Sequence, residues 1–367
     1  MAAENPDSRG LDDLRREIDA IDEKLLELIC ARGRAAREIG RVKASAGAPV
    51  YAPDREKEVL ARLRERNPGP FDDAVLFAIY RELMSGSFAL EKAPRIAYLG
   101  PPGTHSHQAA RERFGSAVEY ESVADIPAAF DEVERRHADY AVVPVENSIG
   151  GGVIDTLDAF IDRQVRICAE MYRTIHHNLL SRAALDQIER VYSKPQAFEQ
   201  CRIWLNETGL MTKTVPVAST SRAAEQAAAE PGAAAIGGTL AGELYGLPVM
   251  VANIEDHPNN VTRFFVLGRE GARPTGQDKS TLLFTVPDRA GALVDVLEVF
   301  RNESINLTHI SSRPSRRRNW EYYFFVDAEG HIDDERVRRG VEAAREFCLQ
   351  LTVLGSYPQA PEGLPGR

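Results

Sequence analysis

One arginine interrupts the most regular apolar pattern of this chain. Between Leu11 and Val42, apolar residues recur at heptad spacing, which predicts a single helix of about 35 residues with an apolar seam. Arg32 occupies a seam position. A guanidinium keeps its proton and is costly to desolvate, so we expect an anion to meet it there. We interpret that anion as the substrate.

Lys43 and Arg15 extend the positive charge along the same helix. Lys43 follows Arg32 by 11 residues, about 20° around the axis and about 16 Å further along, so the two side chains can converge on one small ligand. Arg15 lies about 26 Å before Arg32 and cannot reach that ligand from a straight helix. An antiparallel helix from a second copy would supply it, so we expect an interlocked homodimer or a higher homo-oligomer. The alternative for Arg32 alone is a register-fixing or solvent-reaching side chain.

Two shorter helices complete this segment. Pro53 opens the first, which carries Arg55 and Glu56, and the second places Ser87 and Glu91 one turn apart. The segments LRREIDAIDEKLLELICAR and APDREKEVL resemble the all-helical chorismate mutases over residues 8–92. The resemblance implies that seven residues surround the substrate: Arg15 of the partner chain, Arg32, Lys43, Arg55, Glu56, Ser87 and Glu91.

Two positions depart from the pattern of these mutases. This chain has Ala52 where some relatives have an acid, and Glu91 where some have glutamine. A glutamine amide donates a hydrogen bond to the ether oxygen of chorismate at any pH, whereas a carboxyl must first be protonated. We therefore expect mutase activity to favour acidic conditions.

Composition limits the classes of function. The chain has 367 residues, 43% of them hydrophobic, which predicts two or three domains. Its net charge of −10 argues against general nucleic-acid binding, and we interpret the run Arg316 to Arg318 as a solvated loop. No apolar run approaches the roughly 18 residues that span a bilayer. Four cysteines without CxxC or metal-ligand spacing, and a first segment without an apolar signal region, predict a cytoplasmic protein.

The pattern changes near residues 92–94 from helical to alternating. Short strands are expected at residues 96–99, 140–143, 165–171, 191–193, 234–236 and 264–267, with helices such as 126–135 and 195–207 between them. This is an α/β pattern, and such folds bind ligands in loops at the carboxyl ends of strands, often between two lobes. Polar residues gather there in PVENSIGGG and in NNVTRFF. Thr262 and Arg263 should point to opposite faces, with Arg263 as a carboxylate clamp.

Four motifs, GPPGTHS, PVENSIGGG, SKPQAFEQC and NNVTRFF, resemble prephenate dehydratase over residues 95–270. The resemblance implies a two-lobed fold like that of periplasmic binding proteins, with an active site in the cleft and no metal or organic cofactor. The residues expected there are Thr104, Ser106, Glu146, Asn147, Ser148, Gln196, Thr262, Arg263 and Phe264. Thr262 is expected to donate to the ring hydroxyl that leaves, with Glu146 as a proton reservoir.

The histidines are not expected to act in this cleft. They lack metal-ligand spacing, and we interpret them as surface or satisfied residues: His105, His107, His176, His177 and His257. His105 stands where the dehydratase family usually has phenylalanine.

A third segment follows the linker GREGARPTGQDK. Strands at residues 281–286, 305–311, 320–327 and 349–354, with helices at 290–302 and 333–347, predict a ferredoxin-like α+β domain. VPDRAGAL, INLTHISSRPS and NWEYYFFVDAEGH resemble the ACT regulatory domain over residues 279–357, in the form that senses phenylalanine. The resemblance implies an effector site at Gly291, Ala292, Leu293, Asn306, Ser311, Ser312, Arg313 and Pro314, with Ser311 in place of the usual glutamate. A packing module without a ligand is the alternative.

The three resemblances together imply a multidomain, bifunctional enzyme of phenylalanine biosynthesis. It would convert chorismate to prephenate and prephenate to phenylpyruvate, with feedback by phenylalanine. The alternative is a non-catalytic amino-acid-sensing binding protein on a dimerising helical bundle. That alternative explains the architecture but assigns no role to Arg32 and Lys43 of the long helix.

Overall fold

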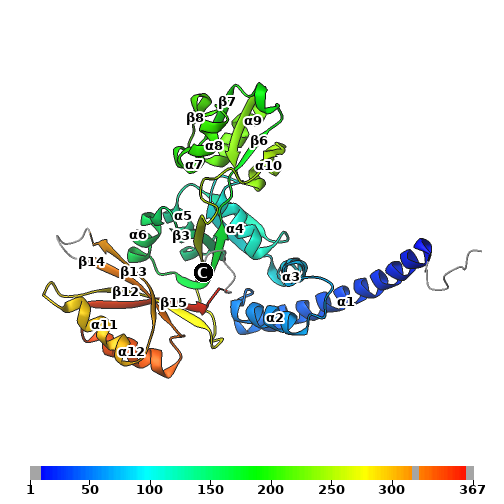
Figure 1. The fold of residues 1–367 in the computed structure, drawn as a ribbon. Coiled ribbons are helices and arrows are strands. Elements are labelled where there is room, and N and C mark those ends of the chain that lie inside the picture. The colour runs from blue at the N-terminus through cyan, green and yellow to red at the C-terminus, as the bar shows by residue number, and fades with distance from the viewer. Residues whose placement is uncertain (1–9, 316–321, 361–367) are drawn as a thin grey trace, which may run out of the picture.

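The computed structural model describes residues 10–315 and 322–360, so the arginine run at Arg316 to Arg318 lies outside the described residues. Three units follow one another along the chain: a helical unit, a two-lobed α/β unit and a C-terminal α+β unit (Figure 1). Within the described ranges, none of the helices combines the length and the apolar character needed to cross a membrane.

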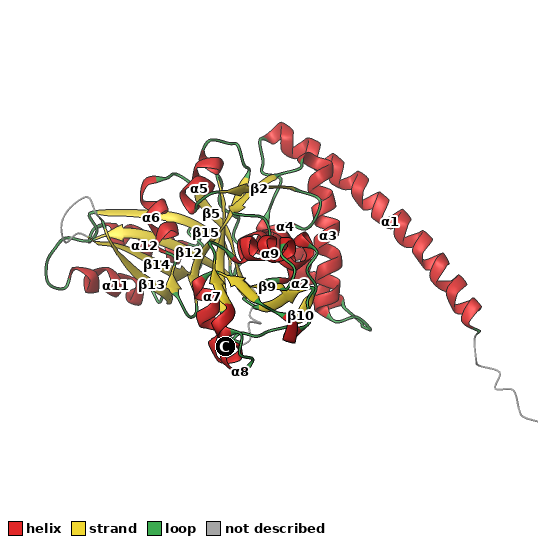
Figure 2. Cartoon of the chain, turned by 90° about the horizontal axis from the view of Figure 1, so that it is seen from above, coloured by secondary structure: helices red, strands yellow, loops and turns green. Residues whose placement is uncertain are grey.

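The helical unit is built around one long helix that extends away from the rest of the chain (Figures 1 and 2). Its helices are α1 (Leu11–Ala46), α2 (Pro53–Arg66) and α3 (Asp73–Lys92). α1 ends at Gly47, whose φ of 66° is left-handed. α3 packs on its C-terminal half, where Gly33 approaches Leu90 and Gly40 approaches Glu91.

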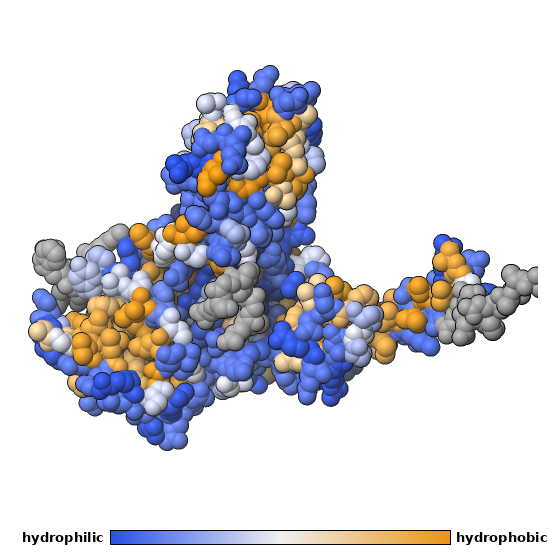
Figure 3. All heavy atoms as spheres, in the orientation of Figure 1, coloured by the Kyte–Doolittle hydropathy of each residue, from blue (hydrophilic) through white to orange (hydrophobic). Residues whose placement is uncertain are grey.

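The apolar seam of α1 is uncovered in the single chain. Leu11, Ile18, Leu28 and Val42 are 57–68% exposed, and Figure 3 shows apolar residues along the projecting helix. Apolar side chains at this spacing are typical of a helix that packs against another helix. Within the described residues, nothing covers this seam.

Aromatic packing fixes the helical unit to the two-lobed unit. Tyr51, just before α2, is buried among Phe88, Phe114 and Tyr140. Its hydroxyl accepts a hydrogen bond of 2.7 Å from Nε of Arg113. The segment that opens α2 is thus part of the core of the neighbouring unit.

The two-lobed unit contains two mixed sheets, and the chain crosses between the lobes twice. The first lobe has strand order β2-β1-β3-β11-β5 with β4 beside β3, and the second has order β10-β6-β9-β7-β8. The first lobe comprises β1 (Arg95–Leu99), α4 (His105–Phe114), β2 (Glu119–Val123), α5 (Ile126–Glu134), β3 (Tyr140–Asn147), β4 (Gly151–Gly152), α6 (Ile154–Asp162), β5 (Arg166–Thr174) and β11 (Val261–Gly268). The second comprises β6 (Asn178–Ser181), η1 (Leu185–Gln187), β7 (Arg190–Ser193), α7 (Pro195–Gln200), α8 (Arg202–Glu207), η2 (Met211–Lys213), β8 (Thr214–Pro216), α9 (Thr220–Ala229), β9 (Ala233–Gly237), α10 (Thr239–Tyr245) and β10 (Val249–Val251).

One predicted helix is divided in the structure. The expected helix over residues 195–207 is two short helices, α7 and α8, because the buried Cys201 between them has φ −117° and ψ 20°, outside helical geometry. The two-lobed α/β architecture itself is the one expected.

The C-terminal unit has the ferredoxin-like βαββαβ order that the sequence predicts. Its four strands form an antiparallel sheet of order β13-β14-β12-β15. The elements are β12 (Asp278–Thr285), α11 (Ala292–Asn302), β13 (Leu307–Pro314), β14 (Tyr322–Glu329), α12 (Glu335–Arg345) and β15 (Gln350–Pro358).

The C-terminal sheet and the first lobe share one hydrophobic core. Phe265 and Leu267 of β11 lie in the same buried cluster as Leu283, Phe325 and Tyr357. A continuous apolar core makes the two units one packed body, with β11 at the contact.

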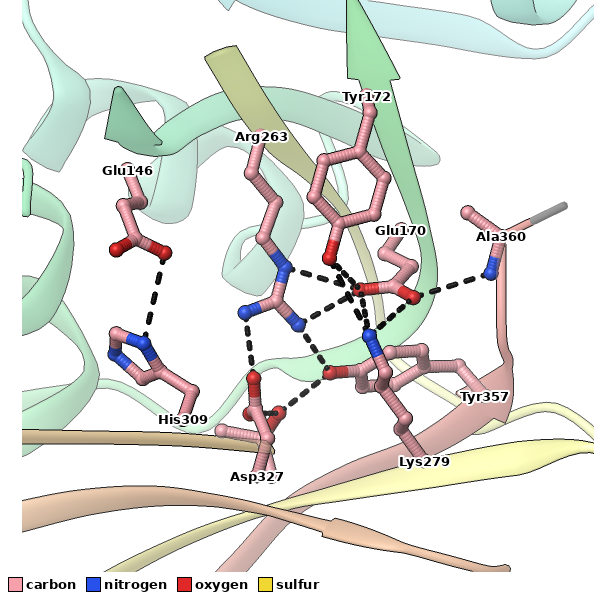
Figure 4. Close-up of polar contacts among 10 residues, drawn as sticks. Glu146, Glu170, Tyr172, Arg263, Lys279, His309, Asp327, Tyr357 and Ala360 are labelled. Carbon is pink, nitrogen blue, oxygen red and sulfur yellow. Dashed lines mark hydrogen bonds and ion pairs between the residues drawn. The ribbon is translucent and has the colours of Figure 1, made fainter. Parts of the chain in front are cut away.

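A buried ion cluster accompanies this core (Figure 4). Nη2 of Arg263 is 2.7 Å from a carboxylate oxygen of Glu170, and Nη1 is 2.5 Å from Asp327. Nζ of Lys279 is 3.0 Å from the other oxygen of Glu170. The Arg263 and Glu170 side chains are 5% and 0% exposed. Each charge is compensated by a partner, which buried ions require.

Removing the central carboxylate charge should therefore destabilise the protein. We expect Glu170→Gln to lower the free energy of unfolding by about 3–5 kcal/mol, because the buried Lys279 loses the charge of its carboxylate partner and Arg263 keeps only Asp327. Urea and thermal denaturation measure this loss. Glu119→Gln is the matched control, because the Glu119 pair with Arg95 is exposed and should be worth about 1 kcal/mol or less. Equal losses for the two variants would contradict the role of the cluster.

Candidate active sites

Four of the predicted cation-site residues come together between α1 and α3. Nη1 of Arg32 donates to the Ser87 hydroxyl at 2.5 Å and to the carbonyl of Leu83 at 2.9 Å. Nζ of Lys43 lies 3.3 Å from Oε2 of Glu91. Ser87 and Glu91 are one turn apart on α3, so the two cations face one short stretch of that helix. This arrangement can hold a small anion between two helices.

Three other predicted residues lie elsewhere. Arg15 is near the far end of α1 and pairs with Asp12 at 3.5 Å. Nη1 of Arg55 is 2.5 Å from Glu58. Glu56 is 3.0 Å from Nη2 of Arg113, a residue of α4 in the two-lobed unit. A single chain therefore presents an incomplete set of the seven expected residues.

A second polar site forms in the first lobe, where three neighbouring strands carry side chains in one row. Thr262 of β11 pairs in register with Asn147 of β3 on one side and with Arg173 of β5 on the other. Nδ2 of Asn147 donates to the Thr262 hydroxyl oxygen at 2.9 Å. Since a hydroxyl both accepts and donates, Thr262 keeps its own hydrogen for another acceptor. Thr262 is thus oriented to act as a hydrogen-bond donor.

The loop after β3 lies close to both this row of side chains and a residue of the second lobe. Oδ1 of Asn147 accepts from the backbone of Gly150 at 2.8 Å. A Cβ at Gly150 would lie 3.6 Å from Nε2 of Gln196, which belongs to α7 in the second lobe. Oγ of Ser148 accepts from the backbone of Val261 at 2.9 Å. Asn147, Ser148 and Thr262 of the first lobe therefore lie close to one another, with Gln196 of the second lobe near the loop that follows Asn147.

Two partly buried cations near these residues are absent from the set that the sequence predicts. Nε of Arg173 is 3.0 Å from Glu112, and its side chain is 9% exposed. Lys194 donates to Oε1 of Gln196 at 3.0 Å, and burial lowers its pKa. The SKPQAFEQC motif could have pointed to Lys194, whereas Arg173 has no local signal because its neighbour Thr262 is 89 residues away.

The GPPGTHS turn contributes structure as well as polar groups. The Thr104 hydroxyl caps α4: it accepts from the backbone of His107 and donates to the carbonyl of Leu99 at 2.9 Å. Ser106 is buried in the first turn of that helix. Nδ1 of His107 accepts from the backbone of Gly103 at 3.1 Å, and burial lowers the pKa of His107 to about 4. These contacts hold the turn in place beside the cleft.

Arg263, Glu146 and Phe264 have surroundings that differ from the expectation. Arg263 points away from Thr262, as alternation along a strand requires, and its partners are the carboxylates of the buried ion cluster. Glu146 is opposite Arg263 in the sheet and lies 3.5 Å from His309 of the C-terminal unit (Figure 4). Phe264 is buried in the core. These surroundings do not fit the expected roles of Arg263 as carboxylate clamp and Glu146 as proton reservoir.

Comparisons with known proteins assign a family to each of the three units. Family models match in order: chorismate mutase type II over residues 14–92, prephenate dehydratase over 96–272 and the ACT domain over 280–345. The bifunctional chorismate mutase/prephenate dehydratase of Aquifex aeolicus is 42% identical over 355 residues, covering 95% of this chain and 98% of the relative. The chain belongs to this bifunctional family. The protein of the same name from Escherichia coli strain K12 is 35% identical over 382 residues, covering 98% and 97%.

A solved structure extends the comparison to the fold. The prephenate dehydratase from Arthrobacter aurescens in complex with L-Phe has a TM-score of 0.67 and 33% identity, covering 74% of this chain and 93% of its own. The predicted family and the predicted fold class are confirmed.

The effector residues expected in the ACT domain divide into two groups. The topology brings Gly291, at the start of α11, to the same end of the sheet as Arg313, at the end of β13. Asn306 lies beyond the other end of α11, whose 11 residues span about 16 Å. Among the rest, Ala292 is buried, Leu293 and Ser311 are partly buried, and Ser312 and Pro314 are exposed. A site that contains both Gly291 and Asn306 would need two copies of the domain.

Arg313 also has a partner within the chain. Its Nε lies 3.1 Å from Oδ1 of Asp158 on α6 of the first lobe. The end of β13 that carries the expected effector residues is therefore tied to the dehydratase domain.

Proposed function

We propose that this chain catalyses two consecutive reactions, chorismate to prephenate in the helical domain and prephenate to phenylpyruvate in the two-lobed cleft. The observation that carries the proposal is the convergence of Arg32 and Lys43 on Ser87 and Glu91. A non-catalytic sensor would have no use for two partly buried cations at that place. Membership of the bifunctional family over nearly the full chain supports both activities.

The first reaction needs no nucleophile; it needs positive charge and a site that restrains the conformation of the substrate. Chorismate rearranges in one concerted step, so the protein has only to hold the dianion in its compact form and offset charge on the ether oxygen. Arg32 and Lys43 supply positive charge, and Glu91 donates to the ether oxygen when it is protonated. A carboxyl can donate to the ether oxygen only in its protonated form, so this step should be faster in acid.

We propose that the mutase site is completed by a second copy of the chain. The exposed seam of α1 supports an antiparallel α1 pair. Such a pair would carry the partner's Arg15 across to Arg32 and Lys43. The homodimer is thus part of the catalytic proposal.

The second reaction breaks two bonds of the prephenate ring. The ring carbon loses its hydroxyl with the bonding electrons, and the bond to the ring carboxylate gives its electrons to the ring as CO2 leaves. The departing hydroxide takes a proton and becomes water, so the dianion yields phenylpyruvate, CO2 and water. Thr262, oriented by Asn147, donates a hydrogen bond to the leaving oxygen. The partly buried cations Arg173 and Lys194 attract the carboxylates of the substrate.

Phenylalanine is the proposed effector of the ACT domain. The dehydratase of Arthrobacter aurescens, which shares this fold, was solved in complex with L-Phe. The placement of Gly291 and Asn306 at opposite ends of α11 supports a site between two ACT domains.

We also propose a cytoplasmic location, which is supported by the absence of any disulfide among the four cysteines.

Two variants should separate the activities. We expect Arg32→Ala to reduce prephenate formation at least about 100-fold while added prephenate is still converted, and Thr262→Ala to do the reverse. Absorbance loss of chorismate and the alkaline phenylpyruvate signal measure the two steps. Arg34→Ala, an exposed neighbour on α1, and Thr262→Ser are the matched controls. If a folded Arg32→Ala or Thr262→Ala protein lost both activities, the assignment of separate sites would be wrong.

Mixing two inactive variants tests the shared mutase site. Arg15→Ala and Arg32→Ala chains should each lack mutase activity. After joint refolding, half of the dimers are heterodimers, and each contains one intact site, so about a quarter of wild-type activity should return. A joint refold that yields mixed dimers but no recovered activity would contradict the proposal.

A further inference from the structure

Two histidine nitrogens are buried without hydrogen-bond partners where the two lobes meet. His105 is the first residue of α4 in the first lobe, and His177 directly precedes β6 in the second. Their rings are 5.7 Å apart between centroids and meet edge to face at 73°. Within residues 10–315 and 322–360, Nε2 of His105 and Nδ1 of His177 are buried and have no hydrogen-bond partner. The expectation that both histidines are satisfied or at the surface is therefore wrong.

Arg173 defines the tautomer of His105. Its Nη1 lies 3.2 Å from Nδ1 of His105. A guanidinium has no acceptor, so Nδ1 must be the acceptor of this hydrogen bond. Burial and the positive charge of Arg173 hold the pKa of His105 well below its usual value. The ring is neutral, and its hydrogen is on the unpartnered Nε2.

Gln200 defines the tautomer of His177 in the opposite sense. Its amide oxygen Oε1 lies 2.7 Å from Nε2 of His177, so Nε2 carries the hydrogen and donates it. Burial lowers the pKa of His177, which keeps the ring neutral. Its buried Nδ1 is consequently an acceptor with a free lone pair.

The two lobes thus present one unused donor and one unused acceptor on adjacent rings. A buried polar group without a partner is costly, so such a pair indicates a ligand group that supplies both complements. A hydroxyl both donates and accepts, whereas a carboxylate only accepts. Of the polar groups of prephenate, the ring hydroxyl alone meets this requirement.

We propose that His105 and His177 together bind the ring hydroxyl of prephenate, the group that leaves in the second reaction. This inference rests on the proposed dehydratase function. Nε2 of His105 donates to the hydroxyl oxygen, and Nδ1 of His177 accepts from the hydroxyl hydrogen. Arg173, which contacts His105, lies opposite Thr262 in the sheet, so both donors belong to one continuous row.

The pair contributes to the bond cleavage without exchanging protons. As the carbon–oxygen bond breaks, its electron pair moves to the oxygen, and the donor at His105 stabilises the growing negative charge. The ring carboxylate leaves as CO2, its bonding electrons enter the ring, and the hydroxide takes a proton from solvent. Because the two histidines come from different lobes, both can contact the hydroxyl only when their rings lie as close together as they do here.

The test compares a ligand that has the hydroxyl with one that lacks it. We expect His105→Phe to reduce kcat/KM for prephenate by about 10- to 100-fold. The inhibition constant of phenylpyruvate, which has no ring hydroxyl, should change much less than kcat/KM for prephenate, because the lost contact between His105 and Arg173 is the one effect that both ligands share. His105→Gln, which restores an N–H donor, should recover part of the loss, and His177→Leu should repeat the pattern of His105→Phe.

The controls separate a local effect from misfolding. The mutase rate of the same variants reports whether the chain is folded. His176→Gln, a half-exposed neighbour that pairs with Glu255, should leave both constants unchanged. A similar loss for prephenate and phenylpyruvate, or no loss for either, would overturn the inference. If the wild-type chain did not convert prephenate, the proposed function would fail instead.

Discussion

Strand β11 is the element on which the arrangement of the dehydratase and ACT domains depends. Consecutive side chains of a strand point to opposite faces, so Thr262 faces the cleft while Arg263 faces the ACT domain. The guanidinium of Arg263 is buried between Glu170 and Asp327, and breaking such a pair typically costs several kcal/mol. The position of β11, which carries Thr262, is therefore set by a contact on its opposite face.

The same strand carries apolar side chains that join the two domains. Phe265 lies in a core that includes Tyr323 and Tyr357 of the ACT domain, and Phe264 lies in a core that includes Tyr51 of the helical domain. The ion pair between Glu56 and Arg113 adds a polar contact at the helical boundary. The dehydratase domain thus lies between the mutase and the regulatory domain and is packed against both. A change in either neighbour would reach its cleft through side chains already in contact.

Most of the architecture could be predicted because its signals are local. The heptad seam defined α1, and the βαββαβ order defined the ACT domain. Arg173 and the pairing of His105 with His177 could not be predicted, since they depend on strand register and on how two lobes meet. The alternation of side chains along a strand correctly predicted that Arg263 and Thr262 point to opposite faces. Alternation alone does not show which face of β11 borders the cleft. The ACT domain covers the other face, so side chains on both faces are buried.

The central claim is that one strand connects the dehydratase cleft to the ACT domain. The most direct measurement is kcat/KM for prephenate, with and without phenylalanine, in the Arg263→Met chain, with Arg263→Lys for comparison and the mutase rate as the internal measure of folding. The account predicts a lower dehydratase efficiency and a weaker response to phenylalanine, with mutase activity unchanged. Wild-type efficiency and a wild-type response to phenylalanine in Arg263→Met would contradict it.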